Sequence, residues 1–257
     1  MSTLAVTIVQ ADLAWHDVAG NREHFKTAIE GLLEPTDLIV LPEMFTTGFS
    51  MNAPDLAETM DGDSVTWMRD MAIKSDAAVC GSIIIVDNQQ YFNRFICASP
   101  TGDLQCYDKR HLFRLADEQD HYAPGDELVI FNLKGWRICP MVCYDLRFPV
   151  WSRNRDSYDL LLYVANWPDR RHHAWATLLR ARAIENLSYV AGVNRTGTDG
   201  NDIPYAGGSS IIGFLGEDLA SLDAQEGTAA ADLDLEKLTA FRDRFPFHAD
   251  ADNFTIT

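Results

Sequence analysis

Residues 137–149 have the sequence RICPMVCYDLRFP, and this stretch decides the fold class. An apolar run leads up to Cys143, and polar residues and a proline follow it. This pattern is typical of an α/β protein in which a strand carries one residue to the edge of a sheet and a turn into a helix exposes it. A lone cysteine at a strand end is often only a small buried residue, so the interpretation of Cys143 as a nucleophile depends on its partners.

Two other predicted strands end in the groups that a thiol nucleophile requires. Residues 38–43 have the sequence LIVLPE, in which an apolar strand ends at Glu43, and residues 107–113 have the sequence YDKRHLF, which carries Lys109. Taken singly, these two charges would be interpreted as solvated surface residues. Together with Cys143, each at the end of an apolar segment, they form a combination that points to catalysis.

The three residue types are suited to nucleophilic chemistry on a carbonyl group. A free thiol is only slightly ionised at neutral pH, so it needs a positive neighbour or a base. Lys109 can supply positive charge, and Glu43 can take the thiol proton and later activate water. Lys109 and the backbone N–H of Tyr144 are the candidates to stabilise the negative charge that develops on oxygen after attack.

Strand and helix patterns alternate along the chain. Apolar runs predict strands over residues 4–10, 37–41, 79–86, 91–98, 104–108, 128–133, 136–143, 160–165, 189–193 and 209–214. Helical spacing predicts helices over residues 21–33, 64–74 with Ser64 as the N-cap, 150–155, 173–186 and 235–244. Hairpins mixed with strand–helix pairs indicate an α/β fold with either one mixed sheet or two packed sheets, and periodicity alone does not choose between them.

Composition and charge indicate a single-domain protein that does not bind nucleic acid or a membrane surface. With 257 residues, 47% of them hydrophobic, and no linker-like segment, the chain is expected to form a single domain, with about 20 C-terminal residues as a tail. A net charge of −17 argues against nucleic acid or a membrane surface as partner, since both attract clustered Lys and Arg. The N-terminus lacks a signal-peptide pattern, so we expect a cytoplasmic protein with five reduced cysteines. The spacing of its Cys and His residues does not indicate a metal site.

The three segments together resemble those of the nitrilase, or carbon–nitrogen hydrolase, superfamily. The sequence LPE, which ends at Glu43, is similar to the family segment that carries the general base. The sequence KRHLF, which begins at Lys109, is similar to the family's lysine segment, and the sequence CYDLRFP, which begins at Cys143, is similar to its nucleophile segment. The family also carries a second glutamate shortly before a Pro-Gly, and Glu118, which precedes Pro124-Gly125, matches it. By resemblance, Glu118 would position Lys109 and the substrate.

This resemblance implies both a fold and a chemistry. The fold would be an αββα sandwich of two mixed sheets flanked by helices, in subunits that pair as a homodimer or a higher homo-oligomer. The chemistry would be hydrolysis of a small amide or nitrile through a covalent thioester or thioimidate, with no metal and no organic cofactor.

Within the superfamily, residues 163–168 (YVANWP), residues 175–186 and residues 193–200 (VNRTGTDG) are similar to the omega-amidase branch. That branch hydrolyses the terminal amide of 2-oxo-acid amides, such as 2-oxoglutaramate and 2-oxosuccinamate, to the oxo acid and ammonia. A substrate carboxylate needs a cation, ideally a guanidinium. The candidate pocket residues are Phe45, Arg147, Trp167 and Arg170. Structural pairing of Arg147 with Asp145 and of Arg170 with Asp169 is the alternative for the two arginines. A place in the core or at a dimer interface is the alternative for Trp167 and Phe45.

Three other interpretations remain open at this point. The chain could be a nitrilase, a carbamoylase or another amidase with the same Glu-Lys-Cys chemistry. It could be a cysteine–histidine hydrolase on an unrelated fold, with His111 or His121 as the base, or a non-catalytic binding module. Loss of activity on replacing His111 or His121 would favour the cysteine–histidine hydrolase. Loss of activity on replacing Glu43 or Lys109 would favour the Glu-Lys-Cys chemistry.

Overall fold

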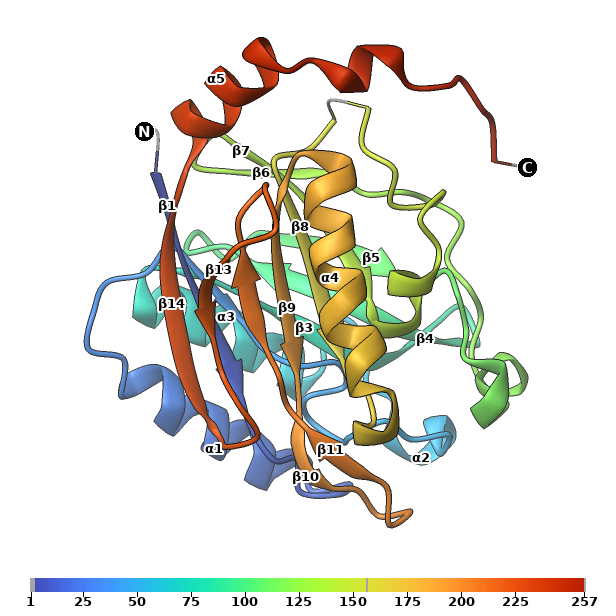
Figure 1. The fold of residues 1–257 in the computed structure, drawn as a ribbon. Coiled ribbons are helices and arrows are strands. Elements are labelled where there is room, and N and C mark those ends of the chain that lie inside the picture. The colour runs from blue at the N-terminus through green and yellow to red at the C-terminus, as the bar shows by residue number, and fades with distance from the viewer. Residues whose placement is uncertain (1–2, 156, 257) are drawn as a thin grey trace.

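The computed structural model describes residues 3–155 and 157–256, and it contains two six-stranded mixed sheets that pack face to face with helices outside them (Figure 1). The predicted sandwich of two sheets is therefore confirmed. Residues 1, 2, 156 and 257, which the predicted single domain also includes, lie outside the described ranges.

The first sheet is built from the N-terminal half of the chain and one late strand. Its spatial order is β14 (Gly227–Asp234), β1 (Thr3–Gln10), β2 (Leu38–Val40), β3 (Ala78–Asp87), β4 (Gln90–Ala98) and β5 (Leu104–Asp108). The β1–β2 and β2–β3 pairs are parallel, and the crossovers between them contain α1 (Val18–Glu30) and α3 (Asp63–Ser75). Both helices bury their apolar side chains, such as Phe25 and Met68, against the outer face of this sheet.

The second sheet has a matching plan. Its order is β13 (Asp218–Ser221), β12 (Ser210–Ile212), β9 (Tyr189–Asn194), β8 (Leu160–Ala165), β7 (Trp136–Val142) and β6 (Phe131–Leu133). The strands β7, β8 and β9 are parallel, and α4 (His172–Asn186) lies in the crossover between β8 and β9. The helix approaches closely because β9 has Gly192, where a Cβ would lie 2.5 Å from a methyl group of Leu179.

The main core lies between the two sheets. Apolar side chains from both inner faces meet there, among them Val6 and Val40 from the first sheet and Met141 and Leu162 from the second. Because the central strands are covered on both faces, they have continuous apolar sequences, and this explains why their positions could be predicted. The last strand, β14, returns to pair with β1 over the full length from Gly227 to Asp234.

Several predicted elements differ from the structure near the ends of strands. Residues 150–155 do not form a helix; the chain after Cys143 forms a short 3₁₀ helix, Cys143–Arg147, and then turns in which the Asn154 side chain accepts hydrogen bonds from the N–H groups of Ser157 and Tyr158. The N-cap of α3 is Gly62 and not Ser64, whose hydroxyl is bonded to Glu58. The strand predicted from residue 128 begins only at Phe131.

Sequence patterns also missed short elements. These are α2 (Ala53–Leu56), the small hairpin of β10 (Thr196–Thr198) and β11 (Pro204–Ala206), β13, and four 3₁₀ helices (Arg114–Ala116, Glu118–Asp120, Asp169–Arg171 and Phe247–Asp250). The region expected to be a tail is in part packed: α5 (Leu235–Arg244) buries Leu238 and Arg242, and residues 251–256 have no regular structure. No helix in the described ranges is long and apolar enough to cross a membrane.

Candidate active site

Cys143 lies where β7 ends, in a backbone conformation that few side chains adopt. Its φ angle is 45°, in the left-handed region, and it is the first residue of the 3₁₀ helix Cys143–Arg147. Outside glycine this conformation costs free energy, and it is found where a fold holds a functional residue in place. The side chain is partly exposed, and its Sγ lies 3.9 Å from the carbonyl oxygen of Asn166.

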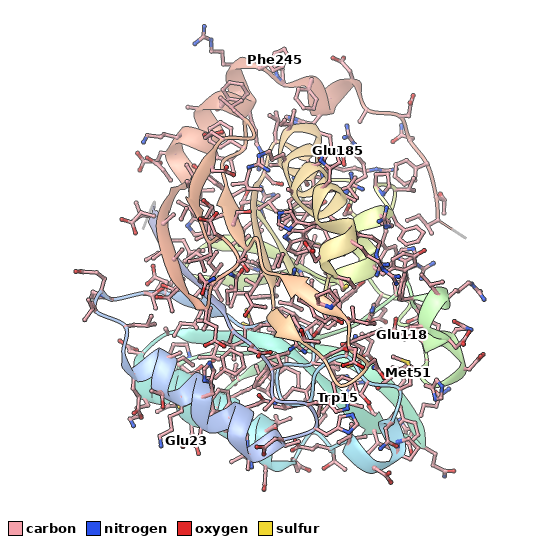
Figure 2. The ribbon with its side chains drawn as sticks, turned by 60° about the horizontal axis from the view of Figure 1, so that its bottom comes forward. Trp15, Glu23, Met51, Glu118, Glu185 and Phe245 are labelled. Atoms are coloured by element: carbon pink, nitrogen blue, oxygen red, sulfur yellow. The ribbon has the colours of Figure 1, made fainter. Side chains whose placement is uncertain are left out.

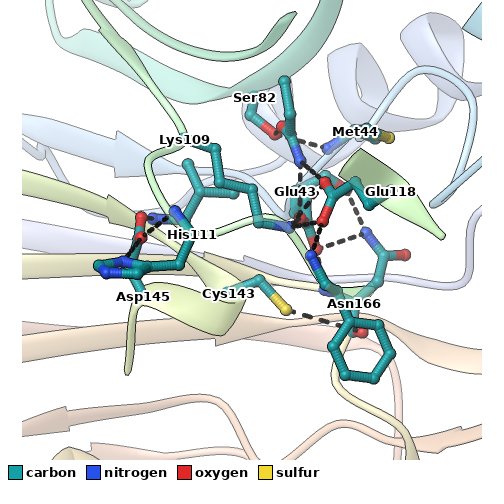
Figure 3. A network of polar contacts seen from close by, with 12 residues as sticks. Glu43, Met44, Ser82, Lys109, His111, Glu118, Cys143, Asp145 and Asn166 are labelled. Atoms are coloured by element: carbon teal, nitrogen blue, oxygen red, sulfur yellow. Dashed lines mark hydrogen bonds and ion pairs between the residues drawn. The ribbon is translucent and has the colours of Figure 1, made fainter. Parts of the chain in front are cut away.

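The ammonium group of Lys109 lies between two carboxylates beside this cysteine (Figure 3). Its Nζ is 2.9 Å from Oε1 of Glu43 and 2.9 and 3.0 Å from the two oxygens of Glu118. All three side chains are fully buried. Glu43 follows β2, Lys109 follows β5 and Glu118 lies in the 3₁₀ helix Glu118–Asp120, so three distant segments meet here.

Neutral polar groups fix the orientation of the Glu43 carboxylate. The amide of Asn93, in β4, donates to Oε1 at 2.7 Å, and the backbone N–H of Asn166, after β8, donates to Oε2 at 2.8 Å. Asn93 in turn accepts a hydrogen bond from Ser82. Glu43 is therefore held by donors from both sheets, and such support restricts a base to one geometry.

The electrostatics of this cluster favour a neutral thiol in the resting protein. Burial and, next, the negative charge of Glu43 raise the pKa of Cys143 well above its usual range, against the opposing effect of Lys109. Burial alone would lower the pKa of Lys109, but the charges of Glu118 and Glu43 outweigh it and raise that pKa. Burial also raises the pKa of Glu118, again against Lys109. The positive charge of Lys109 was expected to favour the thiolate, but the negative charges of Glu43 and Glu118 oppose that effect. Because the thiol keeps its proton at rest, the arrangement suits transfer of this proton to a base during the attack.

A cavity of about 580 Å³ opens in front of Cys143. Its walls come from loops at one end of the sandwich, where Trp15, Met51 and Glu118 lie, whereas Phe245 beyond α5 lies at the opposite end (Figure 2). Part of the lining is aromatic, from Trp15, Phe49, Phe113, Tyr144, Trp167 and Tyr205. The cavity is large enough for a small organic molecule.

Three arginines, Arg147, Arg170 and Arg171, give one wall of this cavity a positive charge. The Arg147 guanidinium lies 4.9 Å from the ring centre of Trp167, and that of Arg171 lies 5.1 Å from the ring centre of Phe113. Arg147 and Arg170 are exposed, while Arg171 is half-buried. Burial, followed by the neighbouring charge of Arg170, lowers the pKa of Arg171.

The structure brings most of the predicted site residues together, and Phe45 is the exception. Its side chain is fully buried on the other side of the Glu43 segment, with its ring against Phe25 and Trp67, and it does not line the cavity. The alternative considered for Arg147, pairing with Asp145, does not form, and the Asp145 carboxylate bonds to His111 and Tyr107.

Neither of the two histidines considered as a base is in a position that supports this role. The ring Nδ1 of His111 lies 2.7 Å from Oδ1 of Asp145, and the ring stacks on Phe148. His121 is exposed on the surface. Across residues 3–155 and 157–256 no group of three or more His, Cys, Asp or Glu side chains is arranged to hold a metal ion.

Sequence patterns missed the groups that support the site from within strands and turns. Asn93 and Ser82 lie inside β4 and β3, where they looked like ordinary strand residues. The sequence has no signal that separates Arg171 from Arg170, and Tyr205, whose hydroxyl donates to Asp199 at 2.8 Å, lies in a strand that the pattern does not predict. A polar residue within an apolar run, as at Ser82 in β3, is the available signal.

Comparisons with known proteins agree with this geometry. The sequence pattern of the family described as "Carbon-nitrogen hydrolase" matches residues 5–243. Omega-amidase YafV of Yersinia enterocolitica is 49% identical over 261 residues, covering 100% of both chains, and 2-oxoglutaramate amidase of Bacillus subtilis is 33% identical, covering 95% of this chain and 96% of its own. The crystal structure of XC1258 from Xanthomonas campestris, a CN-hydrolase superfamily protein with an arsenic adduct in its active site, is similar with a TM-score of 0.97 and 48% identity, covering 100% of both chains.

Proposed function

The chain belongs to the carbon–nitrogen hydrolase family, and we propose that it is an omega-amidase that hydrolyses the terminal amide of 2-oxo-acid amides. The substrates are 2-oxoglutaramate and 2-oxosuccinamate, and the products are the dicarboxylic oxo acid and ammonia. The observation that carries the proposal is the cluster of Glu43, Lys109 and Glu118 beside Cys143, at the base of a cavity with an arginine-lined wall.

In the first half of the reaction, Cys143 forms a bond to the amide carbon. Its Sγ attacks as Glu43 takes the thiol proton, and the carbonyl oxygen becomes negatively charged. Lys109 and the backbone N–H of Tyr144 stabilise that charge. Glu43 then gives its proton to the nitrogen, the C–N bond breaks, ammonia leaves and a thioester remains on Cys143.

In the second half, water cleaves the thioester. Glu43 takes a proton from the water as its oxygen attacks the thioester carbon, and the same two donors stabilise the second oxyanion. The C–S bond breaks, the proton returns to the sulfur and the free acid leaves. Glu118 holds Lys109 in place throughout, a role supported by the two short contacts between them.

The substrate class follows from the charge and shape of the cavity. A molecule with an amide at one end and a carboxylate at the other would place its amide at Cys143 and its carboxylate at the arginine-lined wall, which includes Arg147 and Arg170. A guanidinium matches a carboxylate with two parallel hydrogen bonds. Trp167 would pack against the carbon chain between the two ends.

We further propose that the chain acts as one catalytic domain in a cytoplasmic homodimer. The exposed apolar side chains Ile184 on α4 and Leu215 near it support an interface at that helix, since exposed apolar patches often mark contacts between subunits. Five cysteines without disulfides are compatible with a reducing compartment. Analytical ultracentrifugation tests the dimer, and a monomer at micromolar concentration would contradict it.

The direct test of activity is ammonia release from freshly prepared 2-oxoglutaramate. We expect rapid release by the wild-type protein, loss of at least ~10³-fold in Cys143→Ala, and full activity in Cys106→Ala as the matched control. An acyl-enzyme trapped by acid quench and detected by mass spectrometry on Cys143 would give the intermediate directly. If ammonia appears only from nitriles, N-carbamoyl compounds or simple amides, the proposed substrate is wrong, but the proposed role of Cys143 as the nucleophile still holds.

A further inference from the structure

Several arginines of the chain are paired with acids, as Arg94 is with Asp108 and Arg180 with Asp218. Arg171, which lines the cavity, is not one of them. In the part of the chain that the structure describes, no acidic side chain lies within ion-pair distance of Arg171. A positive group that faces a cavity without an acidic partner can be neutralised there by an anionic ligand.

Burial separates Arg171 from its two neighbours. Arg147 and Arg170 are exposed, so water and salt screen their interaction with a ligand. Arg171 is half-buried, and a charge pair formed in such surroundings is stronger than one on the surface. The pKa of Arg171 is lowered by burial first and by Arg170 second, whereas a negative charge on Cys143 would raise it. Arg171 and Cys143 line the same cavity.

The position of Arg171 is fixed by contacts on both sides. It is the last residue of the 3₁₀ helix Asp169–Arg171 before α4, and its carbonyl oxygen accepts a hydrogen bond from the indole N–H of Trp167 at 2.9 Å. On the other side its guanidinium lies over the ring of Phe113. A cation held by an aromatic face is oriented before a ligand arrives, which lowers the entropic cost of binding.

The same contact connects Arg171 with the catalytic cluster. The backbone N–H of Phe113 donates to Oε2 of Glu118 at 2.5 Å, and the other oxygen of Glu118 bonds to Lys109. The aromatic residue that supports the guanidinium thus belongs to the segment that supports the lysine. Phe113 therefore contacts both the guanidinium of Arg171 and Glu118, which holds Lys109 beside Cys143.

We propose that Arg171 is the specificity-determining residue that binds the carboxylate of the substrate, with Arg147 and Arg170 adding a weaker, screened attraction at the mouth of the cavity. This inference rests on the proposed function and deepens it. It requires an anionic group at the end of the substrate opposite the amide, and it predicts poor hydrolysis of neutral amides of the same length.

Kinetics of ammonia release from 2-oxoglutaramate provide the first test. Arg171→Met should lower kcat/KM about 10- to 100-fold, mainly through KM, because a charge-assisted hydrogen bond is lost. Arg171→Lys should recover part of the lost kcat/KM. Arg147→Met and Arg170→Met should lower kcat/KM less than Arg171→Met does. Arg180→Met, at a residue of α4 that does not line the cavity, should have the wild-type kcat/KM. A larger loss in either neighbour than in Arg171→Met would overturn the assignment.

A second readout needs no turnover. The dicarboxylate 2-oxoglutarate should slow alkylation of Cys143 by iodoacetamide, and the concentration for half-protection should rise about 10- to 100-fold in Arg171→Met. The protection is expressed relative to the alkylation rate of each protein without 2-oxoglutarate. Equal protection in both proteins, or no protection of the wild type, would overturn the proposal. If the wild type releases no ammonia but is protected through Arg171, the proposed substrate fails while the anion site stands.

Discussion

Asp145 and His111 are joined by two contacts at one carboxylate oxygen, the backbone N–H of His111 at 3.0 Å and its ring Nδ1 at 2.7 Å. The other oxygen accepts hydrogen bonds from the N–H of Val142 at 3.0 Å and the hydroxyl of Tyr107 at 2.8 Å. Asp145 is two residues beyond Cys143, and His111 is two residues beyond Lys109. One fully buried carboxylate therefore connects the nucleophile turn of the second sheet with the lysine segment of the first.

Replacement of this carboxylate should impair catalysis beyond its effect on stability. In Asp145→Asn, a weaker acceptor faces the same donors, and the free energy of unfolding should fall by about 1.5–3 kcal/mol. We also expect kcat to fall about 10- to 100-fold with little change in KM, because Cys143 and Lys109 are less well positioned. Tyr107→Phe leaves the other donors to Asp145 in place, so it should lower both the free energy of unfolding and kcat less than Asp145→Asn does. Steady-state kinetics and urea unfolding measure both quantities, and a KM effect alone would contradict the role.

The two charged neighbours of Cys143 should shift its titration in opposite directions. The negative charge of Glu43 raises the Cys143 pKa, so Glu43→Gln should lower it; Lys109 opposes that effect, so Lys109→Met should raise it further. The pH dependence of alkylation by iodoacetamide gives the midpoint, which in the wild type should lie above the ~8.5 of a free thiol. Ammonia release should fall ~10²–10⁴-fold in Glu43→Gln, even though its thiol ionises more readily. Midpoints that move in the same direction would contradict this arrangement.

Among the five cysteines, Cys143 should react first with iodoacetamide at neutral pH. It lines the cavity, and Glu43 can accept its proton, whereas Cys80, Cys97 and Cys139 are buried in the core. Cys106 is half-buried and does not line the cavity. Peptide mapping after limited labelling identifies the site. Cys143→Ala should leave only slow labelling at Cys106, and equal labelling of several positions would count against an activated nucleophile.

The C-terminal helix should contribute to stability through a single buried arginine. Arg242 on α5 donates to Oδ1 of Asp159 at 2.8 Å and to the carbonyl oxygens of Leu187 and Tyr158. Arg242→Met should lower the free energy of unfolding by roughly 3 kcal/mol, the lower end of the range for a broken buried pair, because Asp159 keeps Arg137. The exposed Lys237 on the same helix is the control, and Lys237→Met should unfold at the wild-type denaturant concentration. Equal midpoints for both variants would show that α5 is not anchored in this way.

Much of the fold could be predicted because its central strands are buried on both faces. The apolar runs that end near Glu43 and Cys143 mark β2 and β7 directly, and burial of both faces leaves no polar alternation to confuse the pattern. The ends of elements were less predictable. Asn154 shapes the turns after Cys143 through side-chain hydrogen bonds, which compete with helix formation and which periodicity does not detect.

The candidate site could be predicted only in part, for a geometric reason. Glu43 and Lys109 follow strands of the first sheet and Cys143 follows a strand of the second, and the packing of the two sheets brings these strand ends together. Phe45 was misplaced because the backbone reverses at Met44, where φ is 42°, and directs the next side chain into the core. Asn93 lies far from Glu43 in the sequence, and only the pairing of β3 with β4 brings its amide to the carboxylate.

Glu43 and Lys109 belong to the first sheet, whereas Cys143 and Asn166 belong to the second, so neither half of the sandwich contains a complete site. Catalytic activity therefore depends on how the two sheets pack against each other. A small slip of one layer over the other would separate the sulfur from its base while every strand remained paired. On gradual heating, hydrolysis should then disappear before the circular dichroism of the backbone changes, and the interval between the two temperatures would measure the strength of the contact between the layers.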